Sequence, residues 1–211
     1  MTMAGAPRRL LVATTNRKKL AELADALRDF DCRLESLADV DNAPVVEETG
    51  ATFEENAELK AVALSRHTGL LTLADDSGLE VDALEGRPGV HSARYASEGP
   101  GNASDAANRV KLLTELRGVP PENRTARFRC AIAVAKDGKV VLRSSGAVEG
   151  TILTEERGSG GFGYDPLFVP VGFDRTFAEL PLEAKQKISH RGNALRALRA
   201  RLGEIAREMA S

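Results

Sequence analysis

The feature that most constrains the fold is a run of apolar residues that meets two adjacent carboxylates. Residues Leu70–Ala74 predict a short buried strand, and Asp75 and Asp76 follow it directly. Ser77-Gly78 then predict a turn, before a second apolar stretch over Leu79–Leu84. We therefore expect the two carboxylates where an edge of the sheet meets solvent.

Two carboxylates at the end of a buried strand need a positively charged partner. Adjacent residues of a strand point to opposite faces, so one aspartate can face a cleft while the other braces the turn. Unpaired buried charge is costly, and a divalent metal or a cationic substrate clamp would satisfy it. The alternative is an ordinary polar turn, because Asp, Ser and Gly are common turn residues.

The N-terminal segment has the pattern of a strand, a polar turn and a helix. A strand is predicted over Arg8–Ala13, and Leu20, Leu23 and Leu27 mark the apolar face of the helix. Thr15 or Asn16 is the candidate N-cap. Free amides at a helix N-terminus, with lysines beside them, suit a phosphate, although a solvated first turn is the alternative. The candidate phosphate-binding residues are Thr14, Thr15, Asn16, Arg17, Lys18 and Lys19.

A second carboxylate pair precedes the next helix. Glu47 and Glu48 lie in an acidic loop, and Thr52 with Glu55 forms a capping box that starts a helix to about His67. Magnesium takes one or two protein carboxylates and fills its other positions with water and phosphate oxygens. Two carboxylate clusters on separate loops therefore indicate a magnesium site, although acidic residues also stabilise a helix start.

The order of elements predicts an α/β fold with a mixed sheet. Helices and strands alternate as far as a helix over 104–117, with Val110, Leu113 and Leu116 expected on its buried face. A hairpin then follows around Asp137-Gly138. At 211 residues, the chain is long enough for one domain with a substantial core.

Composition narrows the class of protein. A formal net charge of -2 favours neither a nucleic-acid scaffold nor a membrane-surface protein. The apolar run after Arg9 is too short for a signal peptide, and no stretch is long enough to span a membrane. Cys32 and Cys130 have no metal-ligand spacing and fit a reduced, cytoplasmic protein.

Two C-terminal segments carry further candidate ligand-binding residues. The glycine-rich loop 157–168 presents Phe162, Gly163, Tyr164 and Asp165, and its aromatic rings suit stacking on a planar ligand. The alternative is that these rings fold back onto the sheet.

The second C-terminal segment comprises two predicted helices. Pro181 opens a short helix that contains Lys185, and Ser189 is the candidate N-cap of the last helix. His190 and Arg191 then fall in the first turn of that helix, where cations oppose its dipole unless a polar ligand arrives.

Taken together, the motifs resemble one family across residues 8–200. The ordered set is similar to the Ham1/RdgB-type inosine triphosphate pyrophosphatases. It comprises Thr14-Thr15-Asn16 with Lys19, Glu47-Glu48-Thr49-Gly50, Glu55-Asn56-Ala57 with Lys60, ADDSGLEVDAL, Ser92–Tyr95, GGFGYDPLF and SHR. The chain departs from many bacterial relatives at Thr15 and Lys18, where glycine is common.

The resemblance implies a fold and a reaction. The fold would be one ITPase-like domain over 1–211: an elongated mixed β-sheet flanked by helices, in two lobes with a central cleft. The reaction would be magnesium-dependent hydrolysis of ITP, dITP and XTP to the monophosphate and pyrophosphate, which clears deaminated purines. The protein would be a homodimer.

Each motif residue then has an expected role. Lys19 and the Asn16 loop would hold phosphates with Lys60 as a second clamp, and Glu47 and Asp76 would hold Mg²⁺. Asp76 is also the candidate general base, with Asp75 as its brace. Ser77 would contact the substrate, and the base pocket would comprise Phe162, Gly163, Tyr164, Asp165, Lys185, His190 and Arg191. Buried donors aimed at purine position 6 would reject adenine, because its amino group would leave them unpaired.

Two other functions are considered. A Maf-like pyrophosphatase would act on other modified nucleotides, but the SHR and FGYD motifs argue against it. A nucleotide-sensing or nucleic-acid-binding module would use the basic last helix, and the interleaved Glu204 and Glu208 argue against nucleic acid.

Overall fold

The computed structural model of the chain describes residues 9–27, 32–99, 101–201 and 203. Strands and helices alternate as far as residue 136, after which two further strands and then two helices follow, with 3₁₀ turns among the connections. The sequence places apolar residues at heptad-like spacing along the last helix, and three of them, Leu202, Ile205 and Met209, lie outside the described residues. The strands are β1 (Arg9–Val12), β2 (Arg33–Ser36), β3 (Leu71–Val81), β4 (Thr125–Lys136), β5 (Lys139–Ile152) and β6 (Phe168–Pro170). The helices are α1 (Arg17–Leu27), α2 (Phe53–Thr68), α3 (Asp105–Glu115), α4 (Leu182–Ile188) and α5 (His190–Arg199).

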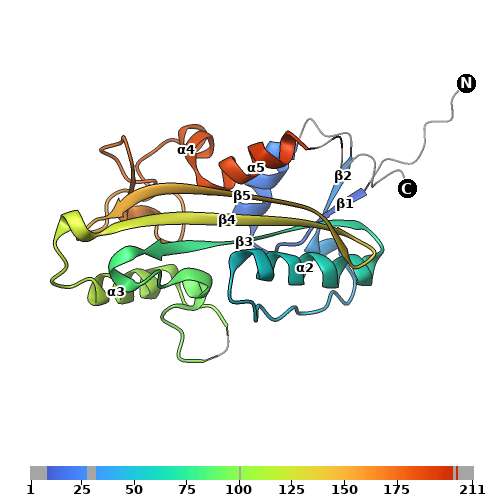
Figure 1. The fold of residues 1–211 in the computed structure, drawn as a ribbon, viewed down its shortest axis with the longest axis horizontal. Helices are drawn as coiled ribbons and strands as arrows, with labels where there is room; N and C mark the ends of the chain where they lie inside the picture. The colour runs from blue at the N-terminus through green and yellow to red at the C-terminus, as the bar shows by residue number, and fades with distance from the viewer. Residues whose placement is uncertain (1–8, 28–31, 100, 202, 204–211) are drawn as a thin grey trace, which may run out of the picture. The chain divides into compact units, whose positions relative to one another are not determined.

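The strands form one mixed sheet in the order β2-β1-β3-β4-β5-β6. Strand β1 is parallel to β2 and β3, whereas β5 and β6 are antiparallel. Figure 1 shows β3, β4 and β5 as long neighbouring strands. The predicted mixed α/β fold is therefore confirmed.

The chain divides into two compact units, and β3 passes from one to the other at Asp76–Ser77. Unit 1 takes the described parts of residues 1–76, 131–145 and 194–211, and unit 2 takes 77–130 and 146–193. Strands β4 and β5 also contribute to both units.

Unit 1 packs the parallel strands against its helices. Leu10, Leu11 and Val12 of β1 are completely buried, as are Leu23 of α1 and Leu73 of β3. The tip of the β4–β5 hairpin is tied to α2, because the backbone N–H of Gly138 donates to Oγ of Ser65 at 3.0 Å. The predicted turn is confirmed, since Asp137 and Gly138 have φ values of 50° and 75°.

Unit 2 has an aromatic core. The rings of Phe128 and Phe168 lie 4.7 Å apart, and those of Phe168 and Phe177 lie 5.1 Å apart. Leu112 of α3 and its C-cap residue Leu116 belong to this core, and both are fully buried. The prediction that Val110 is buried is wrong, because its side chain is 62% exposed.

The structure corrects the expectation for the two aspartates. Strand β3 does not end at Asp75 but runs through Ser77-Gly78 to Val81. Asp75 and Asp76 are only 2% and 6% exposed, so they lie in the interior of a strand rather than at a solvent edge. The strand tolerates them because both carboxylates have cationic or amide partners.

Candidate functional site

Within unit 1, the start of α1 places a lysine against β3. Asn16 is the N-cap, because its Oδ1 accepts a hydrogen bond from the backbone N–H of Lys19 at 3.2 Å. The Nζ of Lys19 lies 3.1 Å from Oδ2 of Asp75, whose side chain is 1% exposed. Thr14 accepts from the backbone N–H of Asn16 at 3.1 Å. Arg17 and Lys18 lie in the first turn of α1, but their side chains are outside the described part of the chain.

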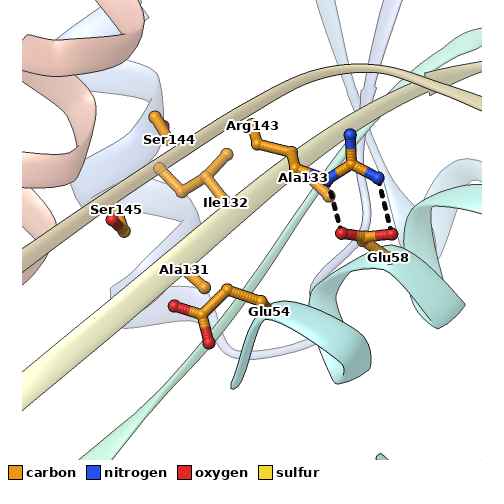
Figure 2. Close-up of a pocket in the computed structure, with 8 residues that line it drawn as sticks. All are labelled: Glu54, Glu58, Ala131, Ile132, Ala133, Arg143, Ser144 and Ser145. Atoms are coloured by element: carbon orange, nitrogen blue, oxygen red, sulfur yellow. Dashed lines mark hydrogen bonds and ion pairs between the residues drawn. The ribbon is translucent and has the colours of Figure 1, made fainter. Parts of the chain in front are cut away.

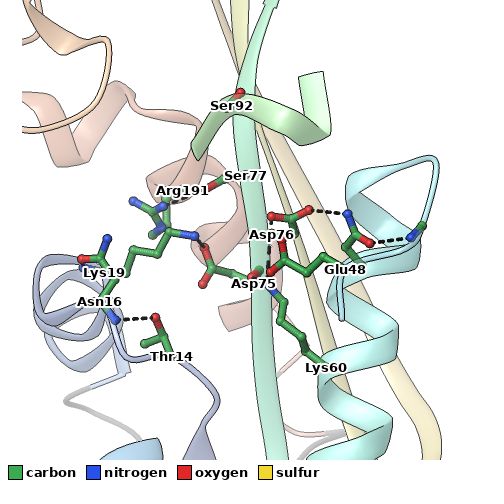
Figure 3. Close-up of polar contacts among 12 residues, drawn as sticks. Thr14, Asn16, Lys19, Glu48, Lys60, Asp75, Asp76, Ser77, Ser92 and Arg191 are labelled. Carbon is green, nitrogen blue, oxygen red and sulfur yellow. Dashed lines mark hydrogen bonds and ion pairs between the residues drawn. The ribbon is translucent and has the colours of Figure 1, made fainter. Parts of the chain in front are cut away.

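Helix α2 brings a second lysine to the same strand. Nζ of Lys60 donates to Oε1 of Glu48 and to the backbone oxygen of Asp75, each at 2.7 Å, and lies 3.9 Å from Oδ1 of Asp76. Figure 3 shows Lys19 and Lys60 approaching β3 from opposite sides. The alternation of Asp75 and Asp76 across the strand therefore gives each carboxylate its own lysine.

Asp76 is held in a site that disfavours its charge. Burial raises the pKa of its carboxyl, and the nearby charge of Glu48 raises it further, against the opposing effects of Lys60, Asn56 and Lys19. Asn56 donates from Nδ2 to Oδ2 of Asp76 at 3.0 Å. A carboxylate with a raised pKa and a fixed orientation suits a general base.

The surroundings of Lys60, in contrast, favour its charged form. Burial alone lowers the pKa of its ammonium, but the charges of Asp76, Asp75 and Glu48 outweigh that effect and raise the pKa above the usual value. Lys60 therefore stays positively charged and holds the negative groups together. The role of Lys60 as a phosphate clamp stays a prediction from the sequence; in the structure, its direct partners are protein oxygens.

The side chain of the acidic loop that contacts Lys60 is Glu48. Glu48 is half-buried and pairs with Lys60, whereas Glu47 is exposed. The loop is anchored next to Glu48, because the backbone N–H of Gly50 donates to Oδ1 of Asn56 at 2.8 Å. A Cβ at Gly50 would lie 2.8 Å from that oxygen, so glycine permits the close approach.

The donor set in unit 1 fits a magnesium ion. Carboxylate oxygens of Asp76 and Glu48 already surround one cation, the ammonium of Lys60. Among the residues that the structure describes, no three histidine, cysteine or acidic side chains group around a common point. A site with two protein carboxylates is the pattern magnesium adopts when waters and phosphates complete its shell.

Within unit 2, a buried ion pair organises the glycine-rich loop. Nζ of Lys185 on α4 lies 2.6 Å from Oδ2 of Asp165, and both side chains are less than 10% exposed. The same Oδ2 accepts from the backbone N–H of Phe162 at 2.8 Å. A Cβ at Gly161 would come within 2.0 Å of that oxygen, so this position requires glycine.

The ring of Phe162 is flanked by two cations. Nζ of Lys185 lies 4.9 Å from its centroid, and Cζ of Arg191 lies 5.9 Å from it. Phe162 is half-buried, which suits a ring that stacks on a planar ligand.

The ring of Tyr164 is not placed in this way. It packs in the core of unit 2, 3% exposed, and its hydroxyl donates to the backbone oxygen of Ser92 at 2.9 Å.

The junction of α4 and α5 positions His190 and Arg191. Ser189 caps α5 as predicted, because the backbone N–H of Gly192 donates to its Oγ at 3.1 Å. Both side chains lie in the first turn and are buried. The ring of His190 stacks on Phe128 at 4.9 Å, and Nη2 of Arg191 donates to Oγ of Ser77 at 3.0 Å. An aromatic contact therefore holds His190, and a hydroxyl contact holds Arg191.

A small pocket elsewhere in unit 1 is lined by none of these residues. Figure 2 shows it beside the Glu58–Arg143 ion pair, in which the two hydrogen bonds are 2.6 and 2.9 Å long. Its volume of about 140 Å³ is below the 300 Å³ or so at which ligand pockets begin. It is therefore no candidate for binding a nucleotide.

Sequence reasoning missed the roles of Asn56 and Glu48, although it noted both residues. Asn56 is a polar residue between Glu55 and Ala57 and is 0% exposed. A fully buried asparagine in a helix must bond to something outside the helix. The sequence alone did not show that it would lie on the buried face.

Comparisons with known proteins agree across nearly the whole chain. The model of the Ham1 family matches residues 10–201. The dITP/XTP pyrophosphatase of Geobacter sulfurreducens is 55% identical over 195 residues, covering 92% of this chain and 96% of that protein. The dITP/XTP pyrophosphatase of Bacillus subtilis is 48% identical over 188 residues, covering 89% and 93%.

Two solved structures share the fold. A HAM1 protein from Coxiella burnetii superposes with a TM-score of 0.84 at 42% identity, over 93% of this chain and 99% of that one. A nucleoside-triphosphatase, or dITP/XTP pyrophosphatase, from Mycobacterium abscessus gives a TM-score of 0.75 at 48% identity, over 90% and 98%. No helix among the described residues is long and apolar enough to cross a membrane.

Proposed function

The chain belongs to the Ham1 family, and we propose that it is a nucleoside triphosphate pyrophosphatase that hydrolyses dITP, ITP and XTP to the monophosphate and pyrophosphate. The identity of about half its residues with pyrophosphatases of this specificity supports the reaction. The Maf-like alternative is set aside because the Ham1 family model matches residues 10–201.

The observation that carries the proposal is the charge cluster on β3. Asp76 is buried, has a raised pKa and lies 3.9 Å from a lysine. In the reaction, water attacks the α-phosphorus, the bond to the bridging oxygen breaks, and pyrophosphate leaves. Asp76 accepts the proton of the attacking water, and Asn56 keeps its carboxylate in one orientation.

The phosphate chain carries about four negative charges, which the site must neutralise. Lys19 and the N-terminus of α1 take the phosphates, as a helix N-terminus favours anions. Asp75 holds the Lys19 ammonium at 3.1 Å and so keeps it positioned before substrate arrives.

Magnesium fits the carboxylates of Asp76 and Glu48. When bound there, the ion would polarise the phosphoryl oxygens and lower the pKa of water. We assign Glu48 this role in addition to, or in place of, the predicted Glu47, because Glu48 approaches the cation that Asp76 also approaches.

The base end of the nucleotide belongs to unit 2. Phe162 supplies the stacking face, while Lys185, His190 and Arg191 supply buried hydrogen-bond donors. Hypoxanthine and xanthine present an oxygen at position 6, which accepts from such donors. Adenine presents an amino group there, which would leave them unpaired and so be rejected. Ser77 of unit 2 holds Arg191 through its hydroxyl and so belongs to the base end.

The two lobes with a cleft, the homodimer and the cytoplasmic location stay predictions from the sequence. Light scattering of the purified protein would test the dimer. The same holds for the expectation that it binds neither nucleic acid nor membranes.

The test is pyrophosphate release with magnesium across ITP, dITP, XTP, ATP, GTP, UTP and CTP, with the monophosphate product identified. We expect the three deaminated purine nucleotides to exceed the rest by at least ~10²-fold in kcat/KM, the range of a hydrogen-bonding pocket. The Asp76→Asn protein is the matched control for contaminating activity. Equal rates with ATP and ITP, or release of orthophosphate instead, would contradict the proposal.

A further inference from the structure

Helix α3 holds the loop that carries Phe162, although nothing in the chemistry described above uses α3. Its first turn begins at Ser104, whose Oγ accepts from the backbone N–H of Ala107 at 3.1 Å. Asp105 and Arg109 are four residues apart and therefore share one face of the helix. Both side chains bond to the same residue of the loop, Gly163.

The two bonds hold Gly163 from both of its polar groups. Its backbone N–H donates to Oδ2 of Asp105 at 2.7 Å, and its backbone oxygen accepts from Nη1 of Arg109 at 2.9 Å. The N–H belongs to the peptide unit shared with Phe162, and the oxygen to the unit shared with Tyr164. Two successive peptide planes are therefore fixed beside the stacking ring, by charge-assisted bonds.

The remaining contacts show that the segment is held on both sides. Asp165 accepts from the backbone N–H of Phe162 at 2.8 Å. Nε of Arg109 also lies 2.9 Å from Oε1 of Glu156, and the Arg109 side chain is only 15% exposed. Asn108 ties α3 itself to the preceding segment, since its side chain bonds to the backbone of Ala93 and Ala96.

Gly163 makes this anchoring necessary. Its φ of +60° lies in the left-handed region, which a glycine enters readily but also leaves readily. Without an external restraint, the peptide planes beside Phe162 could rotate, and the ring would lose its fixed direction. The restraint comes from α3.

We propose that Asp105 and Arg109 are positioning residues for purine recognition, which they serve by clamping Gly163 and so fixing the ring of Phe162. The inference rests on the proposed function, because it takes Phe162 as the surface on which the base stacks. The clamp touches neither the phosphates nor the carboxylates of β3, so its loss should weaken recognition of the base alone.

Two matched variant pairs test the clamp. Asp105→Ala removes the acceptor for the Gly163 N–H, whereas Asp105→Asn keeps an acceptor oxygen but loses the charge at the start of the helix. Arg109→Ala removes the donor to the Gly163 oxygen. Val110→Ala changes the neighbouring position, whose side chain is 62% exposed.

The measurements are KM and kcat for ITP, competitive inhibition by inorganic pyrophosphate, and thermal unfolding. We expect Asp105→Ala and Arg109→Ala to raise KM for ITP by about 10- to 100-fold, the scale of a misplaced binding group, with a smaller change in kcat. The inhibition constant of pyrophosphate should stay at the wild-type value. Asp105→Asn should restore most of the affinity, and Val110→Ala should behave as wild type.

Three results would overturn the clamp. An unchanged KM in both alanine variants is one, and an equal weakening of ITP and pyrophosphate is another. The third is an Asp105→Asn protein as defective as Asp105→Ala, because the effect would then come from helix charge. If the wild-type protein released no pyrophosphate from ITP, the proposed function itself would fail, which is a distinct outcome.

Discussion

Asn56 of α2 donates a hydrogen bond to the carboxylate of Asp76 on β3, at 3.0 Å between Nδ2 and Oδ2. The other end of the same amide accepts from the backbone N–H of Gly50. One fully buried side chain thus links the candidate general base to the loop that carries Glu48. A change at Asn56 should therefore affect both.

Two substitutions at Asn56 separate its two bonds. Asn56→Ala removes both and leaves the partly buried N–H of Gly50 and the buried carboxylate of Asp76 without their partner, so we expect the free energy of unfolding to fall by about 1–3 kcal/mol, with a loss of kcat. Asn56→Asp keeps the acceptor for Gly50 but places a negative charge beside Asp76. It should lower kcat by at least ~10-fold, as general bases contribute about 10²-fold or more. Urea denaturation and steady-state kinetics measure these effects, and a wild-type kcat in Asn56→Asp would contradict the role.

Asp76→Asn should lose most of its turnover yet be more stable than the wild type when no metal is present. Because the pKa of Asp76 is raised in the folded protein, the folded state binds its proton more tightly than the unfolded chain. Wild-type stability therefore falls as the pH rises from the ordinary aspartate value, about 3.9, through the raised value. Asp76→Asn has no carboxylate to ionise in the buried site. Its free energy of unfolding should therefore exceed that of the wild type within this pH range and above it.

Denaturation of both proteins in a chelator, from acid to neutral pH, measures the difference. A turnover loss of at least ~10²-fold should accompany it with magnesium added. The control is Asp75→Asn, which breaks the buried pair with Lys19 and should instead destabilise the protein with a smaller loss of turnover. Lower stability of Asp76→Asn at neutral pH would show that its contacts with Lys60 and Lys19 outweigh desolvation.

Glu47 and Glu48 give a direct choice between two magnesium ligands. Glu48 pairs with Lys60, and its charge raises the pKa of Asp76, whereas Glu47 is exposed. We expect Glu48→Gln to raise the magnesium concentration for half-maximal activity by about 10-fold or more, as for a lost metal contact. Glu47→Gln should change it little. Calorimetric titration of magnesium into each variant gives the same comparison without turnover. If Glu47→Gln weakened magnesium binding more than Glu48→Gln, Glu47 would be the ligand.

The sequence predicts those elements whose signals are local. Thr52 caps α2 as expected, since its Oγ1 accepts from the backbone N–H of Glu55. Ser189 caps α5, and Asp137-Gly138 forms the hairpin turn. In each case, the residues that make the structure lie within four positions of one another, so their spacing is sufficient evidence.

The errors arise where partners distant in the sequence decide the outcome. Residues 75–78 have turn composition, yet they continue β3 because Lys19, Asn56 and Lys60 satisfy the two carboxylates. The buried face of α3 runs through Asn108 and Leu112. A prediction from hydrophobic residues alone leaves out Asn108, because asparagine is polar, and therefore assigns Val110 to the buried face. Asn108 is buried because its amide bonds to backbone groups of another segment.

Arg191 gives the sharpest test of base recognition. Its guanidinium donates to Oγ of Ser77 at 3.0 Å and lies 5.9 Å from the centre of the Phe162 ring. We expect Arg191→Ala to lower kcat/KM for ITP and XTP by about 10²-fold or more, because a hydrogen-bonding pocket loses its donor. The slow reaction with ATP should change little, so the ratio of kcat/KM for ITP to kcat/KM for ATP should fall.

Two control variants bracket the effect of Arg191→Ala. Lys19→Ala should weaken ITP and ATP alike, because a phosphate contact carries no information about the base. Ser77→Ala removes the hydroxyl that holds Arg191 but keeps the guanidinium. It should therefore reproduce the loss of discrimination in weaker form, with kcat/KM for ITP between the wild type and Arg191→Ala. Equal losses for ITP and ATP in Arg191→Ala would place this arginine at the phosphate end instead.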